Sequence, residues 1–254
     1  MRCTLYFIRS RVIFSLLSVV IFSVPTYGAN SGNMEGIKLQ STRVLYPGEN
    51  KNGITFTVTN NTTQPYLLQS RVTSWQPENE GKSSLDEAHD IPFIVLPPLQ
   101  RFEPAEALTL RIRLTRNTLP KDRESVFVLS LKTIPGQAEK MESAQLALAM
   151  QNNLKFFYRP EGLPEYSPEN LAEKLRFQRQ DGQLKVVNPT PYYVTFRSLL
   201  VGKYSIEANA LSQMIPPYGQ QVYPLLSDAR GQVTWRLIDS MGGNTSEQQS
   251  SLAD

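Results

Sequence analysis

His89, the only histidine in the chain, is the residue whose chemistry could most readily support catalysis. With Asp90 beside it, it has the residue types of a general base paired with a carboxylate. However, it lies in the polar run Gly81–Asp90, whose composition is typical of a solvated loop. A histidine-dependent triad would depend on this one loop residue, and a site with several histidine ligands cannot be built. We therefore interpret His89 as a solvated loop residue.

Phosphate-binding and thiol chemistry are no better supported. Gly81-Lys82-Ser83 resembles the end of a phosphate-binding loop, but Gln76 stands where the first glycine is required. The only cysteine, Cys3, lies in a segment that we expect to be removed, which excludes a cysteine nucleophile, a thiolate metal site and an iron–sulfur cluster. Paired carboxylates stay open as a catalytic alternative, because acidic residues occur throughout the chain. The sequence predicts that the protein is not an enzyme and uses no metal or other cofactor.

The first 28 residues are typical of a secretory signal peptide. Three arginines precede the apolar run Val12–Val24, and small residues follow it. The run is shorter than the roughly 20 residues that a membrane-spanning helix needs, which favours a signal peptide over an anchor. Thr26 and Gly28 fit the small positions before a cleavage site, so we expect cleavage near Gly28-Ala29. The exported chain would then enter an oxidising compartment with no cysteine and no disulfide.

The charge of the chain gives no reason to expect nucleic acid or an anionic membrane as a partner. The formal net charge is +3, with 26 basic and 23 acidic residues. Because residues 1–28 hold three arginines and no acid, the chain that remains after cleavage is neutral overall. No later segment is long and apolar enough to cross a bilayer, so we expect an exported, soluble protein without membrane insertion.

Short alternating segments recur through the first half of the chain. In the clearest of them, apolar residues at 108, 110, 112 and 114 alternate with threonine and arginine, which is typical of a half-buried strand. Similar segments are expected at residues 54–59, 66–75, 91–96, 126–131 and 146–158. About seven strands with turn signals between them predict an antiparallel immunoglobulin-like sandwich over residues 29–160.

A second, smaller β-domain is expected over residues 161–243. Arg159-Pro160-Glu161-Gly162 marks the break, and Ser167-Pro168-Glu169 has the residue types of a helix N-terminus. Asp181-Gly182 between two alternating runs predicts a tight hairpin. Further strands are expected at residues 192–200, 221–225 and 232–239. The polar tail 244–254 is expected to have no ordered structure.

Short motifs spread over about 200 residues are individually weak but occur in a consistent order. They are Thr42-Arg43-Val44 with Tyr46-Pro47-Gly48-Glu49, Phe93-Ile94-Val95 with Pro97-Pro98-Leu99 and Arg101-Phe102-Glu103-Pro104, Leu119-Pro120 with Asp122-Arg123-Glu124-Ser125, Ile134-Pro135, Lys155-Phe156-Phe157-Tyr158-Arg159-Pro160, Asn188-Pro189-Thr190-Pro191-Tyr192, and Ile238-Asp239 before Gly242-Gly243. Together they resemble the periplasmic pilus (fimbrial) assembly chaperones of the chaperone–usher pathway. The resemblance implies an all-β fold of two immunoglobulin-like domains in a boomerang arrangement with an inter-domain cleft.

The resemblance implies a binding role for two basic residues and one strand. Arg43 and Lys155 match the pair that holds the C-terminal carboxylate of a pilus subunit, where each charged hydrogen bond contributes about 1.5–3 kcal/mol. Leu146, Leu148 and Met150 match the apolar residues of a donor strand that fills a groove in the subunit. A slip of one residue would turn alanines into that groove, so the carboxylate anchor would fix the register.

Three further residues and one loop also match the family. Glu124, Arg159 and Asp239 match a charged cluster that orients the two domains, and a member removed from such a network leaves the others uncompensated. The stretch between Ile134-Pro135 and Leu146 is short and has no flanking cysteine pair. The resemblance is therefore to the short-loop branch, whose clients are typically rod-forming adhesive pili.

The hypothesis favoured by these matches is a periplasmic chaperone that caps pilus subunits by donor-strand complementation and delivers them to an outer-membrane usher. It would use no cofactor, and in its free form it could dimerise to cover its own donor strand. The alternative is an exported structural pilus subunit or adhesin domain, which would be expected to begin with an alternating apolar extension. Residues 29–36 are polar instead. A secreted hydrolase with paired carboxylates is a third hypothesis.

Overall fold

The computed structural model describes residues 36–75, 91–136 and 148–252. The expected signal peptide with its cleavage site, the Gly81–Asp90 run with His89, and Leu146 of the expected donor strand lie outside the described residues. Within the described ranges, no helix has the length and apolar character needed to cross a membrane. The same ranges contain no group of three or more metal-ligating side chains.

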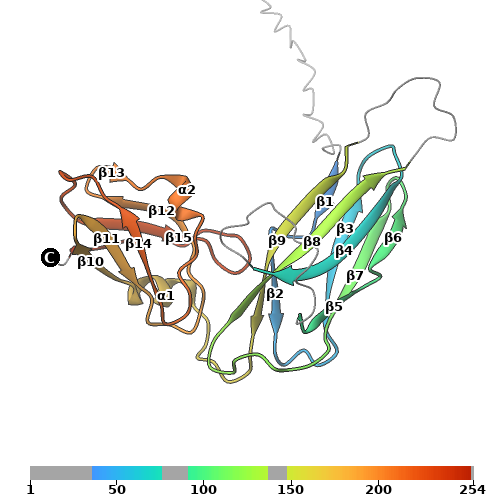
Figure 1. Ribbon diagram of the computed structural model, residues 1–254, viewed down its shortest axis with the longest axis horizontal. Coiled ribbons are helices and arrows are strands. Elements are labelled where there is room, and N and C mark those ends of the chain that lie inside the picture. The colour runs from blue at the N-terminus through green and yellow to red at the C-terminus, as the bar shows by residue number, and fades with distance from the viewer. Residues whose placement is uncertain (1–35, 76–90, 137–147, 253–254) are drawn as a thin grey trace, which may run out of the picture. The chain divides into compact units, whose positions relative to one another are not determined.

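The first domain is a sandwich of two sheets (Figure 1). One sheet contains, in spatial order, β1 (Ile37–Leu39), β3 (Ile54–Asn60), β7 (Ala107–Leu114) and β5 (Phe93–Leu96). The other contains β2 (Arg43–Pro47), β9 (Met150–Arg159), β8 (Ser125–Pro135), β4 (Tyr66–Ser74) and β6 (Leu99–Phe102). Strands of both sheets contribute to one buried apolar cluster, which confirms the predicted sandwich.

Alternation along the strands accounts for this core. In β7, Leu110 and Ile112 are fully buried while Arg111 and Arg113 are exposed, as the sequence predicted. Each such buried side chain contributes roughly 1.5–3 kcal/mol to folding. β6 was not predicted, because three of its four side chains are exposed and it shows no alternation.

One strand pair differs from the antiparallel arrangement that was expected. β1 pairs with β3 in one sheet, whereas β2 pairs with β9 in the other, so the chain changes sheets between β1 and β2. The β2–β9 pair is parallel, and its register begins with Arg43 opposite Lys155. This change of sheet therefore brings two basic residues together that are far apart in sequence.

The second domain is also a two-sheet sandwich. One sheet contains β10 (Arg176–Gln180), β11 (Gln183–Val187) and β14 (Gln220–Pro224). The other contains β13 (Tyr204–Ser205), β12 (Phe196–Val201), β15 (Val233–Leu237) and β16 (Gln248–Ser250), and the short helices are α1 (Pro168–Lys174) and α2 (Ala208–Leu211). Both sheets and α1 contribute to a second buried cluster.

Local sequence signals in this domain have mixed outcomes. Ser167 caps α1 by accepting a hydrogen bond from the Asn170 N–H, and Asp181 and Gly182 adopt the positive φ angles that a tight hairpin turn requires, so both predictions are confirmed. The expectation that the whole polar tail lacks order is wrong, since β16 pairs with β15. Main-chain pairing at a sheet edge needs no apolar side chains, so hydropathy does not detect it.

Each of the two sandwiches contains a buried asparagine that holds a loop by hydrogen bonds. Asn60 and Asn188 are fully buried, and each donates its amide N–H groups to main-chain carbonyls of loops that are distant in sequence. Each also accepts hydrogen bonds through its side-chain oxygen, from Thr62 and Thr190 respectively. These contacts fix the loop after β3 in the first domain and the loop after β11 in the second. In the second domain, that loop leads directly into the contacts with Glu124 described below.

Candidate functional site

The structure brings together the two basic residues that the sequence singled out. Arg43 on β2 and Lys155 on β9 are register partners in a parallel pair. Neighbouring strands lie about 4.8 Å apart and register partners share one face of the sheet, so the two side chains start side by side. The sequence predicted both residues, but their adjacency depends on the strand pairing.

Arg43 is a largely buried cation whose hydrogen-bond acceptors are neutral. Its Nη1 donates to the main-chain carbonyls of Ile238 and Asp239, at 3.4 and 3.3 Å. Its guanidinium carbon lies 5.7 Å from the centre of the Phe157 ring. Burial lowers the pKa of Arg43, although an arginine remains charged at physiological pH. None of the ion pairs between described residues includes Arg43, so the carboxylates of Asp239 and Glu124 act on its charge only through longer-range attraction.

Lys155 also contacts the second domain through a main-chain carbonyl. Its Nζ donates to the carbonyl of Ser212 at 3.3 Å and lies 4.7 Å from the centre of the Trp75 ring. A lysine ammonium has three N–H donors, so several acceptors can share it. The ammonium therefore lies between a carbonyl of the second domain and an aromatic ring of the first.

The turn that presents the carbonyls to Arg43 is organised by Asp239. Its Oδ1 accepts hydrogen bonds from the main-chain N–H groups of Met241 and Gly243, at 2.8 and 2.9 Å. Gly242 has a φ of 92°, and a Cβ added there would lie 2.5 Å from Oγ1 of Thr42 on the segment before β2. Glycine at this position therefore lets the turn lie directly against the first domain.

Of the three charged residues expected to form one cluster, the structure joins two in an ion pair. Arg159 donates through Nε and Nη2 to Oε1 of Glu124, at 2.9 and 2.7 Å. The side chains of Arg159 and Glu124 are 15% and 3% exposed. Asp239 forms no ion pair with either of them in the described structure, and its carboxylate holds the turn instead.

Glu124 also connects the two domains through the main chain. Its Oε2 accepts from the N–H of Tyr193 at 2.9 Å, and its own N–H donates to the carbonyl of Pro191 at 2.9 Å. Burial raises the pKa of Glu124, while the positive charge of Arg159 and the Tyr193 N–H act in the opposite direction. The guanidinium carbon of Arg159 lies 4.1 Å from the centre of the Tyr166 ring. The charges of Glu124 and Arg159 therefore balance each other, and both side chains have further contacts within the protein.

The first residues of β9 form an exposed extension of an otherwise buried face. Leu154 and Phe156 are buried in the first core, whereas Leu148 and Met150 are 67% and 63% exposed although they lie on the same side of the alternating chain. β9 begins at Met150, so Leu148 lies just before the strand. Leu148 and Met150 therefore lie beyond the part of β9 that packs against the core of the first domain.

This extension also has an unfilled main-chain edge. β2 pairs with β9 only over residues 155–159, while β8 pairs with β9 over residues 150–158. Among the described residues, positions 150–154 of β9 thus have a ladder partner on one side only. Such an edge presents N–H and C=O groups that a strand from another chain can pair with.

Sequence reasoning missed the aromatic residues beside the two cations. Trp75 directly follows β4, and Phe157 lies on β9, where it also contacts the ring of Tyr193. Phe157 could have been found, because it lies two residues after Lys155 and shares its face of the strand. Trp75 gave no such signal, because its approach to Lys155 crosses a third strand, β8.

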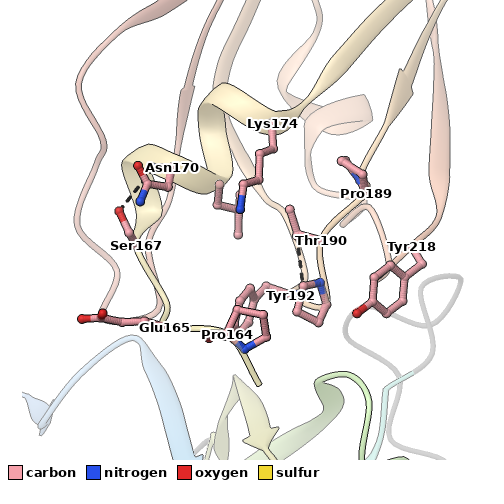
Figure 2. Close-up of a pocket in the computed structure, with 11 residues that line it drawn as sticks. Pro164, Glu165, Ser167, Asn170, Lys174, Pro189, Thr190, Tyr192 and Tyr218 are labelled. Atoms are coloured by element: carbon pink, nitrogen blue, oxygen red, sulfur yellow. Dashed lines mark hydrogen bonds between the residues drawn. The ribbon is translucent and has the colours of Figure 1, made fainter. Parts of the chain in front are cut away.

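A pocket of about 210 Å³ lies in the second domain, with Tyr192, Thr190 and Tyr218 among its lining (Figure 2). Tyr192 lines it and also lies 4.9 Å from the guanidinium carbon of Arg159. Three hydroxyl groups of its lining have acceptors within the protein: Tyr192 donates to the Pro164 carbonyl, Thr190 to Asn188, and Tyr218 to the Asp122 carbonyl. Tyr192 in this lining thus also packs against Arg159 of the Glu124–Arg159 ion pair.

Both domains match known proteins. Residues 36–164 match the family described as "Pili and flagellar-assembly chaperone, PapD N-terminal domain", and residues 170–249 match "Pili assembly chaperone PapD, C-terminal domain". The chain is 38% identical over 212 residues to the chaperone protein FimC of Escherichia coli K12, covering 83% of this chain and 82% of that protein. It is 35% identical over 233 residues to the Escherichia coli chaperone protein FocC, covering 90% and 93% of the two chains.

Solved structures give the same result. The SafB chaperone of Salmonella enterica, determined in complex with the SafA pilin, superposes with a TM-score of 0.72 at 30% identity, covering 85% of this chain and 96% of that one. The Escherichia coli chaperone DraB superposes with a TM-score of 0.71 at 32% identity, covering 85% and 98%. Both superpositions, with SafB and with DraB, cover 85% of this chain and so include both of its sandwiches.

Proposed function

Because the chain belongs to the PapD-like family of periplasmic fimbrial chaperones, whose members are not enzymes, we propose that it captures pilus subunits by donor-strand complementation and delivers them to an outer-membrane usher. The SafB relative was solved with a pilin bound, which supports a pilus subunit as the partner of this chain. The observation that carries the proposal is the pairing of Arg43 with Lys155 at the start of the β2–β9 ladder.

Arg43 and Lys155 would anchor the C-terminal carboxylate of the subunit. Both are cations on one face of the sheet, and their hydrogen-bond acceptors within the second domain are neutral carbonyls. A carboxylate is a stronger acceptor than a carbonyl, since a hydrogen bond between two charged groups is roughly twice as strong as a neutral one. An arriving carboxylate would therefore compete well for these donors.

The anchor would set the register of the donor strand. With the last residue of the subunit held next to Lys155, its preceding residues can pair with the unfilled edge of β9 at positions 150–154. Leu146, Leu148 and Met150 would then fill the groove of the subunit, each contributing roughly 1.5–3 kcal/mol. A slip of one residue would present the alternate side chains instead.

Glu124 and Arg159 would keep the two domains in the orientation that this binding requires. Their ion pair lies within the first domain, and it holds the Glu124 carboxylate that accepts a hydrogen bond from the Tyr193 N–H of the second domain. Asp239 would contribute by holding the turn whose carbonyls contact Arg43. We also propose export with cleavage of the signal peptide near Gly28-Ala29, and a free form that dimerises to cover the exposed donor residues.

A capture experiment tests the proposal. Tagged mature protein would be expressed in its native periplasm as wild type, Arg43→Ala and Lys155→Ala, with circular dichroism to verify folding. Lys203→Ala is a matched control, because Lys203 also lies over an aromatic ring, at 5.3 Å from the Tyr204 centroid, in the second domain. We expect small pilin-like proteins to be recovered by the wild type and the control and lost from both anchor variants. If folded wild type recovers no subunit while pili are being made, the chain is better explained as a structural pilus component.

A further inference from the structure

We propose that Tyr218 is a positioning residue for subunit capture: it fastens the second domain to the segment that precedes β8, and so keeps the domains in place while the anchor cations bind a carboxylate. This inference rests on the proposed function. The Tyr218 hydroxyl donates to the carbonyl of Asp122 at 3.2 Å, and the centre of its ring lies 5.2 Å from the guanidinium carbon of Arg123. Both of these partners belong to the first domain.

Tyr218 has a backbone conformation that tyrosine rarely adopts. Its φ is 54°, in the left-handed region that favours glycine. It is the third residue of the turn Pro216–Gly219, which is closed by a hydrogen bond between the end residues. Glycine or asparagine usually supplies a positive φ at this turn position. The side chain is also 51% exposed, so neither the turn nor burial in a core explains a tyrosine here, whereas its contacts with the first domain do.

The turn that presents Tyr218 is attached to the loop after β11. Nδ2 of Asn188 in this loop donates to the Pro216 carbonyl at 3.0 Å, and the Tyr218 N–H donates to the carbonyl of Thr190 at 3.0 Å. The same loop carries main-chain groups that contact Glu124. Tyr218 and the groups that bind Glu124 are therefore held by one loop of the second domain.

Three consecutive residues of the first domain meet this loop and turn. Asp122 and Arg123 contact Tyr218, with side chains that are 60% and 42% exposed. Glu124, which is buried, binds main-chain groups of the second domain through both its own N–H and its carboxylate. Tyr218 thus adds a contact at the surface to the buried contact between the domains.

The contact would matter most when a subunit is bound. In the free protein, Arg43 and Lys155 each donate to main-chain carbonyls of the second domain and so also help to join the domains. A carboxylate that takes over donors of these cations would weaken those contacts. The contacts of Tyr218 include neither cation, so they would persist and keep the second domain in place beside the anchor.

The test measures the orientation of the domains separately from the capture of subunits. Spin labels on Thr55→Cys and Gln178→Cys, at exposed strand positions of the first and second domains, report the distribution of distances between the domains in the full mature protein. The mature chain is expected to hold no other cysteine. Capture is measured without labels, by pull-down from the native periplasm, and urea denaturation gives the stability of each variant.

Two variants remove the contact from its two sides. Tyr218→Gly removes the ring and the hydroxyl and suits the positive φ, so it relieves backbone strain. Arg123→Ala removes the partner of the ring and leaves the turn unchanged. Tyr204→Ala is the matched control, because the Tyr204 ring and hydroxyl contact Lys203 and Asp228 within the second domain.

We expect Tyr218→Gly to broaden the distance distribution, and to broaden it further in combination with Arg43→Ala. Recovery of subunits by Tyr218→Gly should fall roughly two- to five-fold without a fall in the urea midpoint. Arg123→Ala should act in the same direction, and Tyr204→Ala should change neither the distances nor the recovery.

A distance distribution in Tyr218→Gly as narrow as that of the wild type would overturn the inference, and so would a broad distribution with full recovery of subunits. Lost recovery matched by a clear fall in the urea midpoint would indicate a purely structural residue and overturn it as well. Failure of the proposed function is distinguishable, because it appears as full recovery of subunits by Lys155→Ala, whereas the distances are measured without a subunit.

Discussion

Two basic side chains on the same strand, Lys155 and Arg159, lie four residues apart on one face of β9 but have different surroundings. Arg159 donates two hydrogen bonds to the buried carboxylate of Glu124. Lys155 and its neighbour Arg43 instead donate to main-chain carbonyls of the second domain and lie against aromatic rings. Arg159 is thus compensated by a buried carboxylate at hydrogen-bond distance, whereas the Asp239 and Glu124 carboxylates act on Arg43 only through longer-range attraction.

This difference predicts different roles for the two pairs of charged residues. A buried ion pair contributes when both members are present, and losing one leaves an uncompensated charge. A cation whose hydrogen bonds go to neutral carbonyls, as those of Arg43 do, can exchange them for stronger ones to an anion. We therefore expect substitutions at Glu124 or Arg159 to change stability, and substitutions at Arg43 or Lys155 to change capture of subunits.

The largest effect is expected for Glu124→Ala. It would leave Arg159 in a mostly buried site without a counter-charge and the Tyr193 N–H without its acceptor, so the free energy of unfolding should fall by about 3–5 kcal/mol. Urea denaturation measures the change. Glu124→Gln is the control, since it keeps an acceptor for the N–H but removes the charge. Unchanged stability in Glu124→Ala would mean that the pair is not structural.

Leu148→Glu should weaken subunit capture more than tenfold without affecting stability. Leu148 is 67% exposed in the free protein, so a charge there costs little until a subunit covers it. On binding, the apolar contribution of roughly 1.5–3 kcal/mol is lost and a carboxylate must be desolvated. Pull-down from periplasm provides the measurement. Full capture by this variant would point to a contact strand other than the start of β9.

Lys155→Ala should reduce affinity for a subunit by about 1.5–3 kcal/mol, or roughly 10- to 100-fold. Its melting temperature should stay close to that of the wild type, because the Ser212 carbonyl and the Trp75 ring, two of the groups that would lose contact with Lys155, are neutral. Titration calorimetry with a purified subunit and a thermal melt measure the two quantities. A large fall in melting temperature with unchanged affinity would instead indicate that Lys155 has a structural role, as we expect for Glu124 and Arg159.

Asp239→Ala should have the smallest effect, about 1–2 kcal/mol in stability together with weaker capture. It removes the acceptor of two main-chain N–H groups and so loosens the turn that contacts Arg43. Asp239→Asn keeps the acceptor oxygen and should behave almost like the wild type in denaturation and pull-down. If the asparagine variant is as damaged as the alanine variant, the charge of Asp239 matters, as its match to the family's charged cluster implies.

Much of the fold follows from local sequence. The alternation of residues 107–114 predicts a strand and its buried face, and Asp181-Gly182 predicts the hairpin. β16 could not be predicted in the same way, because its polar residues pair only through the main chain at a sheet edge.

The site was less accessible from sequence, because it depends on pairing between distant segments. Arg43 and Lys155 could be selected by their resemblance to a family, but only the parallel register shows that they are neighbours. Trp75 reaches Lys155 across β8, and no spacing in the sequence encodes that approach. Asp239 matched a charged cluster, yet nearby main-chain N–H groups hold its carboxylate.

The central claim is that Arg43 and Lys155 bind the terminal carboxylate of a subunit. A double-mutant cycle tests it most directly: calorimetry of wild type and the Arg43→Ala/Lys155→Ala variant, each with a captured subunit bearing either its natural C-terminal carboxylate or a C-terminal amide. We predict that amidation weakens binding to the wild type at least tenfold and leaves binding to the variant unchanged. Equal weakening of both proteins by amidation would contradict the claim, because the carboxylate would then be recognised elsewhere.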